Sequence, residues 1–151
     1  MNRDSNQKLR ESQPILIVED SADDFEATKR AFVKANLRNA IAHVLSGEEA
    51  LAYLRSDTKT KPGLILLDLN MPGLDGRKTL EIIKQAPNLK KIPVVILTTS
   101  DDERDVKACY ELGANTFIQK PVDFDGLISA IKRLKEYWFE IALLPKENGH
   151  D

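Results

Sequence analysis

Acidic residues stand at the ends of two short apolar runs of the sequence. The run Leu64–Leu67 ends in Asp68, and the run Ile15–Val18 ends in Glu19 and Asp20. Short runs that are apolar at every position are typical of strands buried on both faces of a parallel sheet. A single acid after a strand is most often a helix cap or a solvated turn residue. The recurrence of acids at two strand ends favours a shared site instead.

Two further apolar runs end in polar residues of a different kind. One ends in Thr98 and the other in Lys120. The carboxyl ends of parallel strands meet at one edge of a sheet, where open α/β folds bind ligands. Three carboxylates at that edge would raise one another's pKa unless a cation lay among them. Because all the candidate ligands are hard oxygens, the sequence predicts Mg²⁺, or Mn²⁺, rather than zinc.

Such a cleft has the components for phosphoryl transfer. A bound Mg²⁺ with an open coordination position accepts a phosphoryl oxygen, while Lys120 and Thr98 can neutralise and hydrogen-bond the other oxygens. Asp68 is then the nucleophile, since a carboxylate can accept a phosphoryl group as an acyl phosphate. The residues therefore predict an aspartyl-phosphate site.

Helical patterns alternate with the apolar runs along the chain. The predicted strands cover residues 15–18, 40–45, 64–67, 92–97 and 116–119. One helix follows each strand, and the expected N-terminal caps of these five helices are Ser21, Ser46, Asp75, Ser100 and Asp123. Five rounds of strand and helix predict an α/β fold, a doubly wound parallel sheet with helices on both faces.

Composition narrows the class of protein further. The 151 residues favour one domain, and the net charge of −2 provides no general attraction to nucleic acid or anionic membranes. The single cysteine, Cys109, excludes an internal disulfide. No apolar run approaches the ~20 residues that span a bilayer. Residues 1–13 are polar and lack the apolar core of a signal peptide, so we expect a flexible arm and a cytoplasmic protein.

The arrangement of these motifs resembles the receiver domains of response regulators, the CheY-like proteins of the flavodoxin-like fold. The matching segments are Val18-Glu19-Asp20, Leu67–Pro72, Gly76, Thr98, Gly113-Ala114 and Lys120-Pro121. The resemblance covers residues 14–134. It implies a five-stranded sheet of order 2-1-3-4-5 and a phosphoryl group received from a histidine kinase, with no separate enzymatic activity.

Carried over by position, the resemblance implies a role for each residue of the cleft. Glu19, Asp20 and Asp68 would hold Mg²⁺ or Mn²⁺ together with the backbone carbonyl of Asn70. Asp68 would be the phosphoryl acceptor.

The resemblance also implies residues that respond to the phosphoryl group. Thr98 and Lys120 would contact it, and Lys120-Pro121 would be a cis peptide. Phe117 would act with Thr98 as a conformational switch. Because phenylalanine lacks a hydroxyl, the alternative is that Phe117 is simply half-buried core.

An apolar block follows the point where a receiver domain would end, in residues 135–151. Its apolar members include Tyr137, Trp138, Phe139, Ile141 and Leu144. We expect an extended last helix from Asp123 to Leu144 whose end packs against a second copy as a homodimer. The alternative is that the block folds back on its own domain. This ending resembles the small regulators that pair with cyanobacterial and bacterial phytochrome histidine kinases.

Two other functions are alternatives to signalling through a phosphorylated receiver. One is a haloacid-dehalogenase-like phosphatase, which expects an aspartate two positions after the nucleophile. Asn70 stands there and cannot act as an acid or base. The other is an interaction module that works without phosphate. Since no basic patch or helix-turn-helix follows the receiver, the expected output is protein contact rather than DNA binding.

Overall fold

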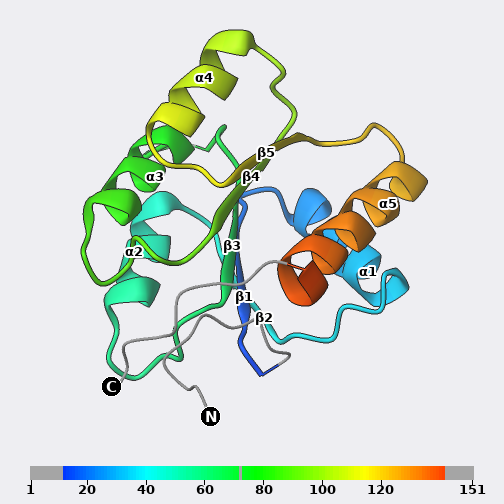
Figure 1. Cartoon of the computed structure of the whole chain (residues 1–151), viewed down its shortest axis with the longest axis horizontal. Coiled ribbons are helices and arrows are strands. Elements are labelled where there is room, and N and C mark those ends of the chain that lie inside the picture. The colour runs from blue at the N-terminus through cyan, green and yellow to red at the C-terminus, as the bar shows by residue number, and fades with distance from the viewer. Residues whose placement is uncertain (1–11, 72, 142–151) are drawn as a thin grey trace.

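A computed structural model of the chain describes residues 12–71 and 73–141, and its centre is a parallel sheet (Figure 1). The strands are β1 (Ile15–Val18), β2 (Ile41–Val44), β3 (Leu64–Leu67), β4 (Val94–Thr98) and β5 (Thr116–Gln119). They are arranged in the order β2-β1-β3-β4-β5, which confirms the predicted topology. The fourth strand starts two residues later than predicted, at Val94, because Pro93 has no N–H to donate to a neighbouring strand.

Four α-helices connect the strands, and a fifth follows β5. They are α1 (Ala22–Lys34), α2 (Gly47–Arg55), α3 (Gly76–Gln85), α4 (Glu103–Glu111) and α5 (Phe124–Lys135). Four of the five predicted caps are confirmed, and the exception is α4. Its cap is Asp102, whose carboxylate accepts a hydrogen bond from the Arg104 N–H, while the Ser100 hydroxyl donates to Asp105.

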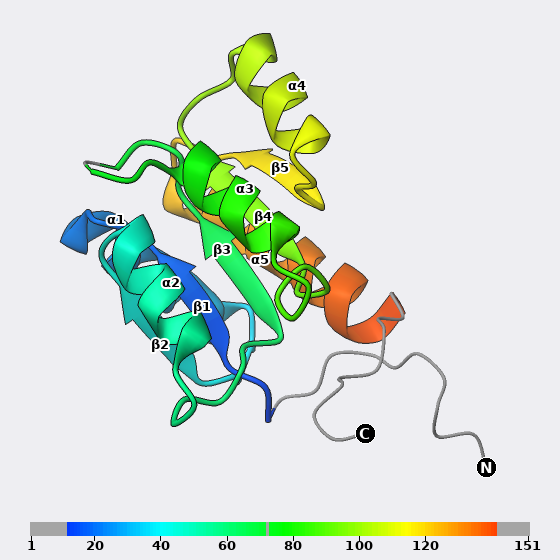
Figure 2. The ribbon, with the colours of Figure 1, turned by 90° about the vertical axis from the view of Figure 1, so that its left-hand side faces the viewer.

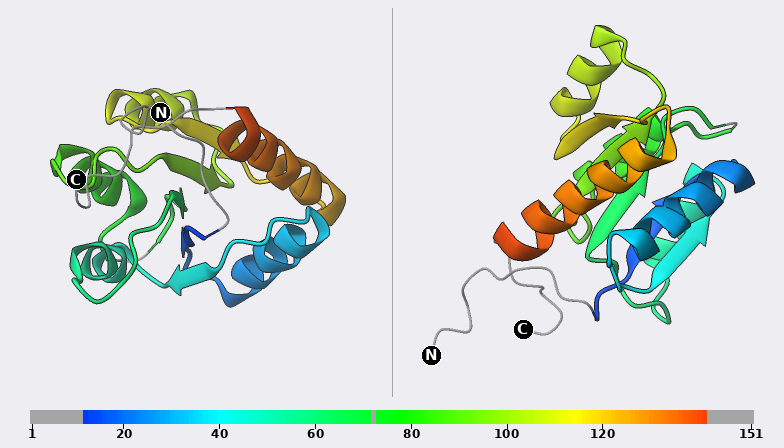
Figure 3. Two further views of the ribbon diagram at one scale, coloured as in Figure 1. Left: turned by 60° about the horizontal axis from the view of Figure 1, so that its bottom comes forward. Right: turned by 90° about the vertical axis from the view of Figure 1, so that its right-hand side faces the viewer.

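The helices cover both faces of the sheet. Figure 2 shows α2 and α3 on one face, with α4 next to β5, and Figure 3 shows α1 and α5 side by side on the other. Alternate residues of β1 divide between two hydrophobic clusters, with Leu16 in the first and Ile15 in the second. Strands buried on both faces explain why these segments are apolar at every position. No helix in residues 12–71 and 73–141 is long and apolar enough to cross a membrane.

The end of the last helix differs from the expectation. After α5 the chain continues as the π-helix η1 (Glu136–Ile141) instead of an unbroken α-helix. Trp138 has only 5% of its surface exposed. It packs with Ile131 and Leu134 in the second hydrophobic cluster, the one between α1, α5 and the sheet. The expectation that Trp138 packs against a second copy is therefore wrong, because its own domain buries it.

The neighbours of Trp138 are less enclosed. Tyr137 is 50% exposed, and Phe139 is partly buried against the same cluster as Trp138. Leu144 and the side chain of Ile141 lie outside what the structure describes.

The peptide bond between Lys120 and Pro121 is trans, so the expected cis bond is wrong. Trans is the ordinary preference of such bonds. The N–H of Lys120 donates to the carbonyl of Thr98 at 2.6 Å, which continues the pairing of β5 with β4 by one residue. This pairing places Lys120 at the edge of the sheet where β1 and β3 also end.

Candidate functional site

Three acidic residues meet at the carboxyl edge of the sheet, as predicted. Glu19, Asp20 and Asp68 each offer one carboxylate oxygen, and these oxygens lie within 4.8 Å of one another. Strand pairing continues beyond the strand ends to hold them, since the Glu19 N–H donates to the Val44 carbonyl and the Asp68 N–H to that of Val18. Glu19 and Asp68 are buried, whereas Asp20 is exposed.

The loop after Asp68 is held closely against α3. The N–H of Gly76, the first residue of α3, donates to the Leu69 carbonyl at 3.2 Å. A Cβ at Gly76 would lie 2.3 Å from the Asp68 carbonyl oxygen and 2.6 Å from the Leu69 Cα. Only glycine allows this approach, because both obstructing atoms belong to the backbone. The position of the Asp68 backbone therefore depends on α3.

One ammonium group faces the acids from the end of β5. Lys120 Nζ lies 2.6 Å from Glu19 Oε1, 3.0 Å from Asp24 Oδ2 and 3.8 Å from Asp68 Oδ2. Its side chain is 12% exposed. Burial lowers the pKa of Lys120, but the hydrogen bond with Glu19 and the charge of Asp68 outweigh it and leave that pKa above its usual value. Lys120 therefore stays charged.

For Glu19, in contrast to Lys120, the effect of burial on the pKa exceeds that of the charged partners. Burial is the largest influence on Glu19 and raises the pKa of its carboxyl, although the hydrogen bond with Lys120 opposes the shift. The N–H of Ser21 also donates to Glu19 Oε2 at 3.1 Å. Glu19 thus has two donors that favour its ionised form.

Thr98 completes the set of predicted residues at this edge. It is fully buried at the end of β4, and its hydroxyl accepts a hydrogen bond of 3.4 Å from the Asn70 side-chain amide. The N–H of Asn70 in turn donates to Asp68 Oδ1 at 3.3 Å. Asn70 therefore connects the Asp68 carboxylate, through its backbone N–H, to Thr98, through its side-chain amide. The resemblance to receiver domains implies a role only for the backbone carbonyl of Asn70.

Phe117 lies one strand away from these contacts. Its side chain is partly buried against the cluster beneath α2 and α3, and its N–H donates to the Tyr110 hydroxyl at 3.1 Å. This placement fits both a switch residue and ordinary core.

The residues present fit a divalent cation. Lys120 pairs with Glu19, Asp24 and Asp68, and Asp20 lies in the same acidic group, so carboxylates outnumber the ammonium by three at this edge. Buried carboxylates are costly unless paired, and a hard divalent ion matches their oxygen ligands. Glu19, Asp20 and Asp68 are the residues that would hold it, and the ion would neutralise charge on the acids and on a phosphoryl group.

Asp24 also belongs to the site, although the sequence indicates only a capping role for it. Asp24 reads as the acid of a capping box with Ser21, and its N–H does donate to the Ser21 hydroxyl at 3.1 Å. Its carboxylate, however, pairs with Lys120, which lies 96 positions away in the chain. Because β5 brings this partner to α1, local sequence carries no signal for the contact.

A second unpredicted cluster joins the loop after Thr98 to α3 and α4. Asp105 Oδ1 accepts two hydrogen bonds from Arg77, at 2.6 and 3.0 Å, and its other oxygen accepts one from Ser100 at 2.7 Å. The hydrogen bonds from Ser100 and Arg77 hold the pKa of the Asp105 carboxyl below its usual value. Within α4 only Cys109 is buried, so this cluster is a main tie of that helix to the domain.

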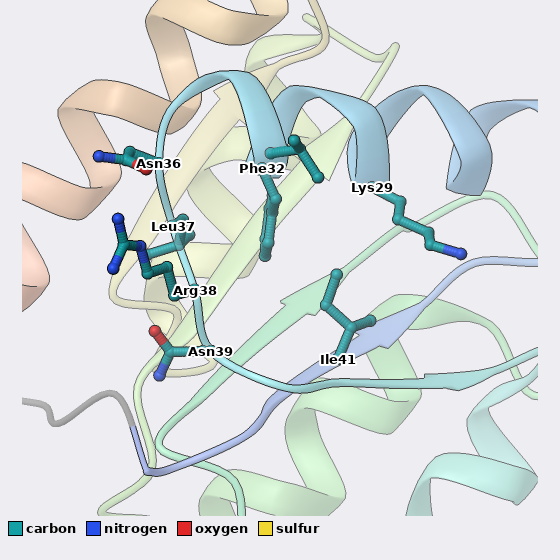
Figure 4. Close-up of a pocket in the computed structure, with 8 residues that line it drawn as sticks. Lys29, Phe32, Asn36, Leu37, Arg38, Asn39 and Ile41 are labelled. Atoms are coloured by element: carbon teal, nitrogen blue, oxygen red, sulfur yellow. The ribbon is translucent and has the colours of Figure 1, made fainter.

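A pocket of about 550 Å³ lies at the opposite edge of the sheet, where α1 ends and β2 begins (Figure 4). It is lined by Lys29, Phe32, Val33, Asn36, Leu37, Arg38, Asn39 and Ile41. Figure 4 shows Lys29 and Arg38 extending in opposite directions rather than converging on one point. None of its lining residues belongs to the acidic group at the carboxyl edge.

Comparisons with known proteins agree with this geometry. Residues 15–132 match the family described as the response regulator receiver domain. The chain is 39% identical over 142 residues to Response regulator Rcp1 of Synechocystis. The aligned region covers 89% of this chain and 97% of that protein.

Solved structures of similar proteins show the same fold. The phosphorylated cyanobacterial phytochrome response regulator RcpA superposes with a TM-score of 0.83 at 38% identity. The Mn²⁺-bound form of Rcp1 superposes with a TM-score of 0.81, also at 38% identity. Each comparison covers 89% of this chain and 99% of the other. The chain therefore belongs to the response regulator receiver family and is homologous to phytochrome response regulators.

Proposed function

We propose that the protein receives a phosphoryl group on Asp68 from a histidine kinase and signals through the change that follows. The observation that carries this is the buried Asp68 carboxylate, which lies beside two acids and an ammonium at the carboxyl edge. In the transfer, an Asp68 oxygen bonds to phosphorus as the phosphorus–nitrogen bond to the kinase histidine breaks. The electron pair of that bond stays on the imidazole nitrogen.

The surrounding residues have distinct roles in this proposal. Glu19, Asp20 and Asp68, with the Asn70 carbonyl, hold Mg²⁺ or Mn²⁺. The similarity to Mn²⁺-bound Rcp1 supports this choice of ion. Lys120 and Thr98 bind oxygens of the transferred group.

The kinase that fits best is a phytochrome histidine kinase, because RcpA is a phytochrome response regulator. The protein acts in the cytoplasm through contact with other proteins, and it catalyses only its own phosphorylation and dephosphorylation. A phosphatase of the haloacid-dehalogenase type is disfavoured by Asn70, whose amide is hydrogen-bonded to Thr98. A module that works without phosphate is excluded if Asp68 is phosphorylated.

Phosphorylation is proposed to shift Thr98 and Phe117 between two arrangements, and the region after α5 to support a homodimer. Tyr137, half-exposed at the start of η1, is the described residue best placed for such a contact. Deleting the chain from Tyr137 onward tests this by sizing chromatography, and a truncated chain that still elutes as a dimer contradicts the assignment.

Beryllofluoride, a phosphoryl mimic, tests the acceptor directly. With Mg²⁺ at concentrations about 100-fold above its dissociation constant, it should raise the melting temperature of the full chain by roughly 5 to 10 °C. Asp68→Asn should abolish the shift. The control Asp57→Asn, in an exposed loop, should keep it. An equal shift in Asp68→Asn would rule out this acceptor.

A further inference from the structure

The Lys120 ammonium is shared among three carboxylates, and its contacts do not favour the proposed acceptor. Nζ is within hydrogen-bonding distance of Glu19 at 2.6 Å and Asp24 at 3.0 Å. Asp68 lies at 3.8 Å, which is an ion pair without a hydrogen bond. The resting structure therefore directs the donors of Lys120 away from Asp68.

We propose that Asp24 is a positioning residue that holds Lys120 away from Asp68 and so limits phosphorylation. This inference rests on the proposed function of Asp68. Asp24 touches no reacting atom, and it acts only through the lysine.

The two residues that hold Lys120 differ in how readily they can release it. Glu19 is buried at 6% side-chain exposure and also accepts from the Ser21 N–H, so it belongs to the fixed part of the site. The Asp24 side chain is 48% exposed in the first turn of α1. Water can solvate the Asp24 carboxylate when the lysine departs, whereas Glu19 has no comparable access. Asp24 is therefore the releasable partner.

The transferred group changes the competition for the lysine. A phosphoryl group on Asp68 adds roughly 1.5 to 2 negative charges and three acceptor oxygens. Lys120 must leave part of its resting contacts to reach them. Removing the Asp24 charge lowers the cost of that movement, both during transfer and in the phosphorylated product.

Acetyl phosphate is the probe for this effect in the full chain. An Asp68 oxygen bonds to phosphorus, the bond from phosphorus to the acetyl oxygen breaks, and its electron pair leaves with acetate. With Mg²⁺ present, Asp24→Asn should increase the phosphorylation rate roughly two- to fivefold, the range expected for loss of a half-exposed ion pair. Beryllofluoride should bind tighter by a similar factor.

Asp23→Asn is the matched control for charge. Asp23 precedes Asp24 in the same exposed turn, and none of the described contacts joins it to Lys120. It should stay within about 1.5-fold of the wild type in both assays, since only general screening of exposed charge is involved. The conservative variant Asp24→Glu should return both values toward wild type.

A double-mutant cycle with Lys120→Met asks whether Asp24 acts through the lysine. In the Lys120→Met background, Asp24→Asn should change beryllofluoride affinity by less than about 1.5-fold. Lys120→Gln provides a second background without the ammonium if the methionine variant does not fold, and the same small change is expected there. An equal gain in the Lys120→Met background, a slower Asp24→Asn, or no difference between Asp24→Asn and Asp23→Asn overturns the inference. Failure of wild-type labelling would instead refute the proposed function.

Discussion

Replacing Trp138 with alanine should destabilise the domain strongly. The indole is 5% exposed and lies in the cluster between α1, α5 and the sheet. A tryptophan buries about 200 Å², and at about 25 cal/mol per Å² this corresponds to about 5 kcal/mol. Because the end of a helix can relax around the gap, we expect a loss of about 3 to 5 kcal/mol in the free energy of unfolding.

Urea denaturation followed by circular dichroism is the suitable assay, because Trp138 is the only tryptophan and its removal abolishes the fluorescence signal. Tyr137→Ala is the matched control. Its side chain is adjacent and aromatic but 50% exposed, so its loss should be below about 1.5 kcal/mol.

The reasoning is refuted if Trp138→Ala costs less than about 1 kcal/mol, or if the two variants lose the same amount. Protein concentration provides a separate check. A wild-type midpoint that rises with concentration, and a Trp138→Ala midpoint that does not, would mean that a second copy buries the indole.

Three further perturbations follow from the contacts described above. Gly76→Ala places a Cβ 2.3 Å from the Asp68 carbonyl oxygen, so both the melting temperature and beryllofluoride affinity should fall. Burial lowers the pKa of Lys84 to about 8, below the 10.5 of the unfolded chain. The unfolded state then binds more protons between these values, so urea denaturation should show stability rising from pH 8 toward 10, and Lys84→Met should flatten this rise. Asp105→Asn removes the partner of Arg77, and amide hydrogen exchange should become faster in α4.

Each of the three has an outcome that would contradict it. An unchanged melting temperature in Gly76→Ala would mean that the loop after Asp68 can move away from α3. An identical pH slope in Lys84→Met would assign the slope to another group. For α4 the control is Glu103→Gln, an exposed acid of the same turn. Equal exchange in the Glu103 and Asp105 variants would remove the anchoring role of Asp105.

The sheet and the acceptor edge could be predicted because their signals are local. A strand buried on both faces must be apolar at each position, and the polar residue after it marks where the strand leaves the sheet. Asp68, Thr98 and Lys120 are all found in this way. The cap of α4 was misplaced because Ser100 and Asp102 are both good capping residues, and local preference does not choose between them.

The helical spacing of the apolar residues indicates the burial of Trp138, whereas the aromatic composition of the segment suggests an interface. Leu127, Ile131, Leu134 and Trp138 follow one another at spacings of four, three and four, which is a single stripe along a helix. The stripe continues through the change from α5 to η1. The aromatic residues 137–139 resemble an interface by composition alone, whereas the position of Trp138 on this stripe places its side chain in the core.

The pairing of Asp24 with Lys120 and of Arg77 with Asp105 could not be read from the sequence. Each joins residues from different strand–helix units, and each depends on which charged side chains the sheet order brings together. Charged residues on helices have many possible partners before the fold is known. Their choice is a property of the assembled domain rather than of any segment.

The Tyr110 hydroxyl has a consequence for the outer border of the sheet. β5 is an edge strand, and an edge presents unpaired N–H groups on which a strand of another molecule can add. The phenol of Tyr110 accepts the hydrogen bond of one such group, the Phe117 N–H, at 3.1 Å. Because Tyr110 belongs to α4, a strand of another molecule would have to displace this side chain before it could pair with the Phe117 N–H.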